Sequence, residues 1–317
     1  MTGADVKALA VACGFELAGI ARAEPAEDRA RYHAWVGEGN AGEMRYLTDR
    51  RAAVRDDPRN LLESARSIVC VGKVYQTAWP HSTRFSDPER AWISRYAWGG
   101  DYHDEMRRRL ERLSALVREQ AGADLQSKIC VDTAPLLERS YARLAGLGWI
   151  AKNTCLINQQ SGSWIFLGEL LLSIELDPDA PPPDRCGTCT RCIDACPTGA
   201  IPQDRRTELG AHVFGCDICQ DVCPWNRRAA VTADPAFAPR HFAPPLDELA
   251  DLSHEQFREM FRGTPVTRAR YSGFLRNVAI AMGNSGLARF RDPLERLAAS
   301  DDPVVADAAR WGLERLA

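Results

Sequence analysis

The chain has 317 residues, 45% of them hydrophobic and 26% charged, which is ordinary for a globular protein. This length suits about two domains and a small extra module, because single cores seldom grow beyond roughly 250–300 residues. The formal net charge of −3 argues against a general nucleic-acid binder. No apolar run reaches the ~18 residues that span a bilayer, and the N-terminus lacks the pattern of a secretion signal. We therefore expect a cytoplasmic protein in a reducing compartment, with no membrane contact.

Strands alternate with helices through residue 176, which indicates an α/β domain with a largely covered sheet. Strands are predicted over residues 15–21, 67–75, 128–131 and 163–176, and helices over residues 5–12, after Asp101 and from Pro135. In such sheets ligands gather beyond the carboxyl ends of strands, where Asp132 lies. By position alone, Asp132 could equally cap the helix that follows. No glycine-rich phosphate loop follows a strand, so the sequence does not support nicotinamide or ATP binding.

A proline-rich spacer over residues 177–184 predicts a boundary, with a cysteine-rich domain at 177–230 and a helical region at 231–317. Short helices expected over residues 272–282, 292–299 and 303–316 are typical of α-solenoid repeats.

Seven arginines stand between Arg258 and Arg291 against one acid, Glu259. They could be a solvated helical face. Because Tyr271 and Phe274 accompany them, contact with RNA is the alternative.

Seven cysteines between residues 186 and 223 carry the strongest signal. The first run is Cys186-x-x-Cys189-x-x-Cys192-x-x-x-Cys196-Pro197, and the second is Cys216-x-x-Cys219-x-x-x-Cys223-Pro224. This spacing is typical of bacterial ferredoxins with [4Fe–4S] clusters. A zinc site would need only four ligands and leave three thiols unexplained, and disulfides are disfavoured in a reducing compartment.

In the ferredoxin arrangement, three cysteines of one run share a cluster with the last cysteine of the other. One cluster would then take Cys186, Cys189, Cys192 and Cys223, and the second would take Cys196, Cys216 and Cys219. A fourth ligand for the second cluster is missing, since residues 200–215 contain no cysteine. Another residue could complete it, it could have three ligands, or a segment could be absent near residues 201–206; we expect the last.

The chain resembles the epoxyqueuosine reductases of bacterial tRNA modification. The resemblance covers nearly the whole chain and rests on these motifs: RYAWGGDYH (95–103), VDTAPLLER (131–139), GLGWIAKNTCLI (146–157), GSWIFLGEL (162–170), CGTCTRCIDACPTGAI (186–201), GCDICQDVCPWN (215–226) and FLRNVAIAMGN (274–284). It implies a cobalamin-binding α/β domain over residues 1–176, a ferredoxin-like domain with two [4Fe–4S] clusters, and a HEAT-like tRNA-contacting region. It also implies that electrons from an external donor pass through the clusters to cobalamin, which reduces epoxyqueuosine to queuosine at the wobble position of the anticodon stem-loop.

Site residues also follow from the resemblance. Asp132 matches the proton donor, and the matched cobalamin contacts are Arg55, Arg95, Lys152, Asn153, Asp217 and Ile218. Asp101-x-His103 lacks the glycine of a histidine-ligated cobalamin motif, so we expect no histidine ligand and assign His103 to the helix start. We expect a monomer. The alternatives are a cobalamin-dependent reductive dehalogenase and a plain ferredoxin-like electron carrier.

Overall fold

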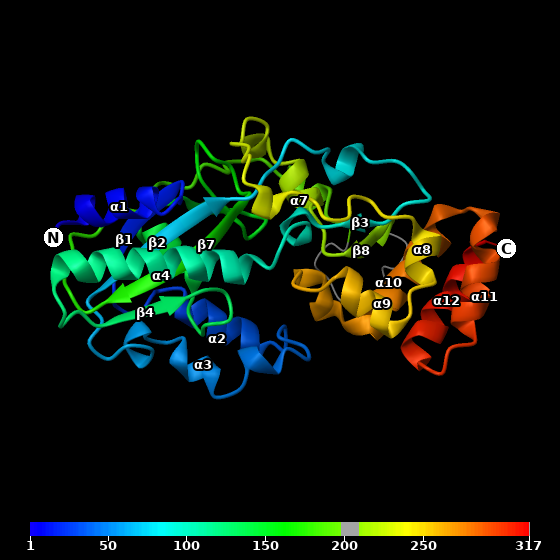
Figure 1. The fold of residues 1–317 in the computed structure, drawn as a ribbon, viewed down its shortest axis with the longest axis horizontal. Helices are drawn as coiled ribbons and strands as arrows, with labels where there is room; N and C mark the ends of the chain where they lie inside the picture. Colours follow the sequence, from blue (N-terminus) through cyan, green and yellow to red (C-terminus); the bar gives the residue numbers. More distant parts are fainter. Residues whose placement is uncertain (198–208, 317) are drawn as a thin grey trace. The chain divides into compact units, whose positions relative to one another are not determined.

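The computed structural model describes residues 1–197 and 209–316 (Figure 1). The chain divides into two compact units. Unit 1 comprises Met1–Val74, His103–Cys189 and Arg227–Ala230, and unit 2 comprises Tyr75–Tyr102, Thr190–Asn226 and Val231–Ala317. These units interleave along the chain, whereas the three predicted domains are consecutive. The absent segment predicted near residues 201–206 lies outside the described residues.

Unit 1 is built on a four-stranded sheet in the order β1-β2-β7-β4. Its strands are β1 (Leu17–Arg22), β2 (Ser67–Val74), β4 (Ser127–Cys130) and β7 (Ile165–Leu172). Every residue of β2 is buried, because the strand lies inside the sheet and helices cover both faces. These strand bounds agree with the predicted strands to within a few residues, so the predicted strands are confirmed. The chain is a mixed α/β protein.

All neighbouring strands of this sheet pair antiparallel. The rule that ligands gather at carboxyl ends holds for parallel sheets, so the ligand position predicted from it was wrong for this sheet. Asp132 nevertheless follows the carboxyl end of β4, which is an edge strand.

Two helices cover the faces of the sheet. The long helix α4 (Tyr102–Ala121) runs along one face (Figure 1). There Met106 and Leu110 approach Gly168 so closely that a side chain on Gly168 would meet them. The short helix α5 (Glu138–Leu144) packs on the other face, and its Tyr141 joins the core there. Helix α5 begins three residues after the predicted start at Pro135, because residues 133–136 form tight turns.

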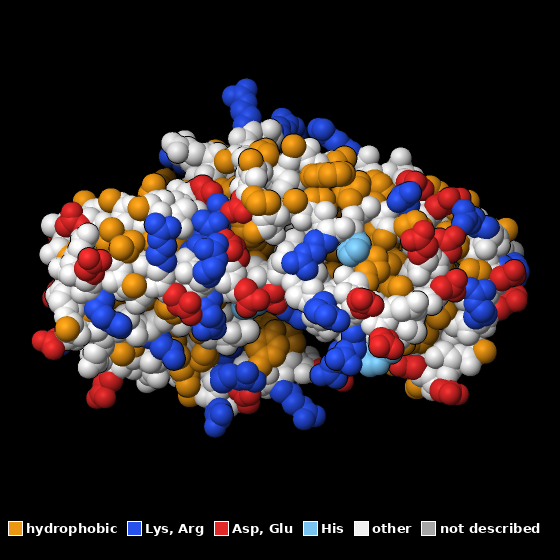
Figure 2. Space-filling view, in the orientation of Figure 1, with side chains coloured by type: hydrophobic (Ala, Val, Ile, Leu, Met, Phe, Trp, Pro, Cys, Tyr) orange, Lys and Arg blue, Asp and Glu red, His pale blue; other side chains and the backbone are white. Residues whose placement is uncertain are grey.

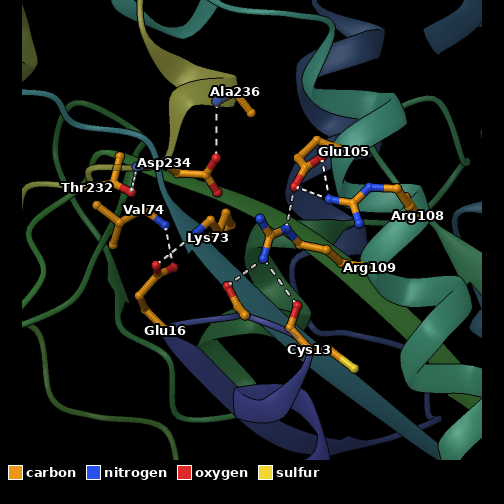
Figure 3. Close-up of polar contacts among 11 residues, drawn as sticks. Cys13, Glu16, Lys73, Val74, Glu105, Arg108, Arg109, Thr232, Asp234 and Ala236 are labelled. Atoms are coloured by element: carbon orange, nitrogen blue, oxygen red, sulfur yellow. Dashed lines mark hydrogen bonds and ion pairs between the residues drawn. The ribbon is translucent and has the colours of Figure 1, made fainter.

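The remaining elements of unit 1 surround this sheet. They are α1 (Gly3–Ala12), α2 (Arg29–Gly37), α3 (Arg51–Val54), β5 (Trp149–Ile150) and β6 (Leu156–Ile157). Figure 3 shows how α1 and β1 are fixed: the Arg109 guanidinium of α4 donates to the carbonyl oxygens of Cys13 and Gly14, each at 3.2 Å. The buried Lys73 ammonium donates to the Glu16 carboxylate at 2.7 Å. These charged contacts join the first helical segment to the sheet and to α4.

Unit 2 is mainly helical. Its elements are β3 (Trp92–Ile93), α6 (Arg191–Asp194), β8 (His212–Phe214), α7 (Ile218–Asp221), α8 (Leu246–Ala250), α9 (His254–Met260), α10 (Arg270–Ser285), α11 (Arg291–Ala298) and α12 (Pro303–Arg315). The last three match the predicted C-terminal helices. Their apolar faces form one core around Phe274, Val278 and Leu294. Among the described helices, none is long and apolar enough to cross a bilayer.

Candidate active site around Asp132 and the cysteine runs

Asp132 is held in an unusual backbone conformation. Its φ of 44° lies in the left-handed region, which residues with a β-carbon rarely adopt. The Asp132 backbone N–H donates to the Glu138 carboxylate. Its side chain, 48% exposed, brings Oδ2 to 3.1 Å from Nε2 of His103 in the first turn of α4. Asp132 therefore presents an accessible carboxyl group fixed at both its backbone and its side chain.

A third carboxyl group, that of Glu169, acts on Glu138 from the interior of the sheet. Glu169 sits in β7, is fully buried, and pairs across the sheet with Cys70 of β2 and Cys130 of β4. Burial and the nearby charge of Asp132 raise the pKa of Glu138 to about 7. Burial, and then the charge of Glu138, raise the pKa of Glu169 well above its usual range. These two acids therefore resist losing both protons at neutral pH.

Three residues near Asp132 were not predicted as part of the site. His103 was assigned only to the helix start; the structure places it there and also against Asp132. Glu138 lies inside the VDTAPLLER motif, and Glu169 is the single acid within the strand sequence IFLGELLL. A lone acid in an otherwise apolar buried strand is the signal that could have revealed Glu169, because isolated charges are costly to bury.

The turn at 152–154 contains two of the predicted cobalamin contacts. Lys152 is exposed, and its ammonium donates to the carbonyl oxygens of Gly187 and Cys189 at 2.8 and 3.0 Å. The Asn153 side chain accepts from the Cys155 backbone N–H at 3.2 Å. Thr154 has a φ of 64°, and its carbonyl accepts from the Arg139 guanidinium at 2.7 Å. This turn therefore joins the start of α5 to the first cysteine loop.

Three other predicted contacts are buried and bonded within the protein. The Arg55 guanidinium donates to the carbonyl oxygens of Tyr46 and Arg51. In unit 2, Arg95 is 2% exposed, donates to the 77–80 loop and stacks on Trp98 at 4.3 Å. The Asp217 carboxylate accepts from the Ser94 hydroxyl and the Arg95 N–H. Their contact with a cofactor stays a prediction. Ile218, the first residue of α7, is partly exposed.

Both cysteine runs have the same local fold. A one-turn helix starts two residues after Cys189 in the first run, as α6, and two residues after Cys216 in the second, as α7. Helices α6 and α7 pack against each other. Each run then ends in Cys-Pro. The sequence repeat is therefore a structural repeat, as a two-cluster ferredoxin requires.

Among residues 1–197 and 209–316, no group of three or more His, Cys, Asp or Glu side chains is arranged to hold a metal ion. The ligand sets of the two clusters therefore remain predictions from spacing. The donor chemistry fits iron, since soft thiolates at two-residue separations are the usual ligands of iron–sulfur clusters.

A basic cavity of about 630 Å³ opens in unit 2 beside α9. It is lined by Arg258, Arg262, Arg270, His254 and Tyr271, together with Glu255 and Glu259. Figure 2 shows Lys and Arg side chains over this part of the molecule, with acidic ones between them.

The other predicted arginines have different roles. The Arg289 guanidinium pairs with Glu89 and Asp247, and that of Arg268 lies 3.3 Å from Asp101. Phe274, expected beside RNA, is fully buried between Phe257 and Phe261, so that expectation was wrong.

Comparison with known proteins identifies the family. The family model described as epoxyqueuosine reductase QueG, DUF1730, matches residues 55–133. An epoxyqueuosine reductase of Xanthomonas campestris is 36% identical over 98% of this chain and 95% of its own length. That of Gloeobacter violaceus is 40% identical over 90% of this chain and 97% of its own length. The chain belongs to the epoxyqueuosine reductase family.

Solved structures of epoxyqueuosine reductases have the same fold. A crystal structure of one with an epoxyqueuosine-modified tRNA-Tyr stem loop has a TM-score of 0.90 and 28% identity, and it covers 99% of this chain and 89% of that one. The Bacillus subtilis enzyme, with its catalytic aspartate loop swung out of the active site, has a TM-score of 0.87 and 28% identity over 99% of this chain and 90% of that one.

Proposed function

We propose that this protein reduces epoxyqueuosine to queuosine at the wobble position of tRNA, acting as a cytoplasmic monomer. The observation that carries this proposal is 36% identity to an epoxyqueuosine reductase across 98% of the chain. The relative solved with an epoxyqueuosine-modified tRNA stem loop supports the choice of substrate. These likenesses favour this activity over that of a dehalogenase or a plain electron carrier.

The reaction removes one oxygen atom. Converting an epoxide to an alkene consumes two electrons and two protons and releases water. Asp132 is the residue we assign to deliver a proton to the departing oxygen, because its carboxyl group is accessible and its backbone and side chain are both held. A group in this position, with a neighbouring histidine, suits general acid catalysis. Residues 131–134 would form the loop that is swung out in the Bacillus subtilis relative.

The electrons require cofactors, since no side chain supplies them at low potential. When bound, cobalamin would supply the reducing cobalt at the substrate. We assign Lys152, Asn153 and Ile218 to its surroundings because these side chains keep exposed surface. The buried side chains of Arg55, Arg95 and Asp217 would instead stabilise the neighbouring loops through their hydrogen bonds.

We assign the cysteines to two [4Fe–4S] clusters fed by an external electron donor. Cys186, Cys189, Cys192 and Cys223 would hold one cluster, and Cys196, Cys216 and Cys219 would hold the other. The matching folds of the two runs support this assignment. The corresponding domains would be cobalamin-binding over 1–176, ferredoxin-like over 177–230 and HEAT-like over 231–317.

The basic cavity of unit 2 is our candidate for contact with the tRNA backbone. Arg258, Arg262 and Arg270 line it, and among the described residues none of the three is in an ion pair. Arg270 also has a φ of 56°, a strained conformation of the kind that clusters at ligand-binding sites. The partly buried Tyr271 ring beside them could stack on a base.

Replacing Asp132 by Asn tests the function. Purified D132N should keep wild-type iron and cobalt per chain and bind the modified stem loop normally. Its turnover should fall at least ~100-fold, the scale of general acid catalysis. As a matched control, Asp124→Asn changes an exposed acid in the turn before β4 and should leave turnover unchanged. Wild-type turnover in D132N would overturn the role of Asp132. Wild-type protein that contains iron and cobalt, yet leaves the epoxide intact with a strong reductant, would overturn the proposed reaction.

A further inference from the structure

Glu169 is a fully buried carboxyl group whose location demands an explanation. Cross-strand pairing places it on the sheet face shared with Cys70 and Cys130, which α5 covers. Among the described residues, no N–H or O–H donor reaches either Glu169 oxygen. The side chain that acts on Glu169 most strongly is the Glu138 carboxyl group at the start of α5. Two neighbouring carboxyl groups favour a state in which one of them carries a proton, because their like charges repel.

The surroundings leave the pair with one negative charge at most. The titratable groups that face it are Cys70 on β2, Cys130 on β4, Asp132, and Arg139 on α5. Burial raises the pKa of both thiols, so they stay neutral and add no cation. Arg139 is the one cation in this set, and it lies at the exposed end. Two adjacent carboxyl groups in such a site share one proton, because their like charges repel.

The shared charge lies next to the strained residue. Glu138 accepts from the backbone N–H of Asp132, which holds a left-handed conformation without being glycine. Arg139, the next residue, donates to the carbonyl of Thr154, which is also left-handed. The start of α5 therefore restrains two strained turns, one with Asp132 and one after Lys152 and Asn153. Such strain persists only where surrounding contacts fix it.

We propose that Glu138 is a positioning residue that, with the buried Glu169 beside it, locks the Asp132 loop in the conformation that directs the carboxyl group of Asp132 toward His103. Glu169 holds the Glu138 carboxyl group in place and keeps the pair at a single charge. The inference rests on the proposed role of Asp132, but the restraint on the loop can be measured without turnover.

The first test is peptide-resolved hydrogen exchange across residues 131–134. Glu138→Ala should speed exchange there roughly tenfold or more, as expected when a hydrogen bond to a charged acceptor is lost. Glu138→Gln keeps an accepting oxygen and should retain most of the protection. As the matched control, Glu119→Ala removes an exposed acid of α4 and should change nothing. Unchanged exchange in E138A would overturn the proposal.

The second test is turnover. E138A should lower kcat roughly 10- to 100-fold, the cost of a misplaced catalytic group. KM for the stem loop and the iron and cobalt contents should stay at wild-type values. E138Q should recover most of kcat at neutral pH but alter its pH profile, because it removes a titrating group.

A wild-type pH profile in E138Q would overturn the shared proton. If E138A does not fold, E138Q and Glu169→Gln still test the proposal, because hydrogen exchange over residues 131–134 and the pH profile of kcat can be measured on both. If D132N remains active while E138A loosens the loop, the function of Asp132 fails and the restraint stands.

Discussion

Asp132, Glu138 and Glu169 form a short chain of carboxyl groups from the surface to the middle of the sheet. Asp132 is exposed, Glu138 is partly buried, and Glu169 is fully buried. A buried acid that stays protonated destabilises a folded protein at neutral pH, because the unfolded chain is free to ionise. The protein keeps this unfavourable pair beside the residue that it fixes, which is typical of functional sites.

The first consequence is a pH dependence of stability. The pKa of Glu138 is raised from 4.5 to about 7 in the folded protein, so the folded state holds a proton that the unfolded state releases. Stability contributed by the protonated pair is therefore full below about pH 4.5 and is lost as the pH rises through about 7. Glu169→Gln should flatten this loss, and its melting temperature relative to wild type should rise from pH 5 to 8.

The matched control is Glu175→Gln, an exposed acid shortly after the same strand. It should track wild type at every pH. A relative melting temperature of E169Q that falls with pH would contradict the assignment of a protonated pair.

The position of Asp132 just after a strand could be predicted from the sequence because its evidence is local: a strand precedes it and a motif surrounds it. That Asp132, His103, Glu138 and Glu169 lie close together could not be predicted, because their meeting depends on strand register and on the turn after β4. Arg95 was predicted as a cofactor contact. Its guanidinium donates to the 77–80 loop, and the sequence alone does not indicate this pairing.

At the scale of elements, the C-terminal helices depend on small residues where they cross. A β-carbon on Gly283 of α10 would lie 2.6 Å from Cα of Gly312 in α12. Gly283→Ala would force the two backbones apart and should destabilise the protein by about 1–3 kcal/mol, as overpacking does. Urea unfolding of this region, followed by tryptophan fluorescence, would measure the change.

Gly273 on the same helix provides the control. A β-carbon there meets nothing within 4 Å, so Gly273→Ala should stabilise the helix by about 0.5–1 kcal/mol. Equal effects of the two substitutions would contradict close packing of α10 and α12.

Helices were predicted more accurately than the sheet. The start of α4 after Asp101 and the boundaries of α12 follow from local sequence signals, and both are confirmed. Antiparallel pairing of β2 with β1 and β7 is a long-range property that alternation with helices does not determine. The delayed start of α5 arose because Pro135 begins a turn before the helix.

For the whole molecule, a net charge of −3 conceals a local basic site. Arginines such as Arg289 and Arg296 are neutralised by acids, whereas Arg258, Arg262 and Arg270 keep their charge toward one cavity. Binding of RNA at this cavity, as proposed, would release counterions, so affinity should fall steeply with salt although the protein is acidic.

This charge distribution predicts which substitutions affect RNA binding. Replacing Arg258 and Arg262 together by Ala should weaken binding of the modified stem loop, and the slope of log affinity against log salt should drop by about 1 per lost phosphate contact. Arg289→Ala, which removes an arginine already paired with Glu89 and Asp247, is the matched control and should keep the wild-type slope. Fluorescence anisotropy across a salt series would measure both. If the double variant keeps the wild-type slope, this cavity is not part of the RNA-binding surface. Turnover by the same variant would show whether the reaction depends on the cavity.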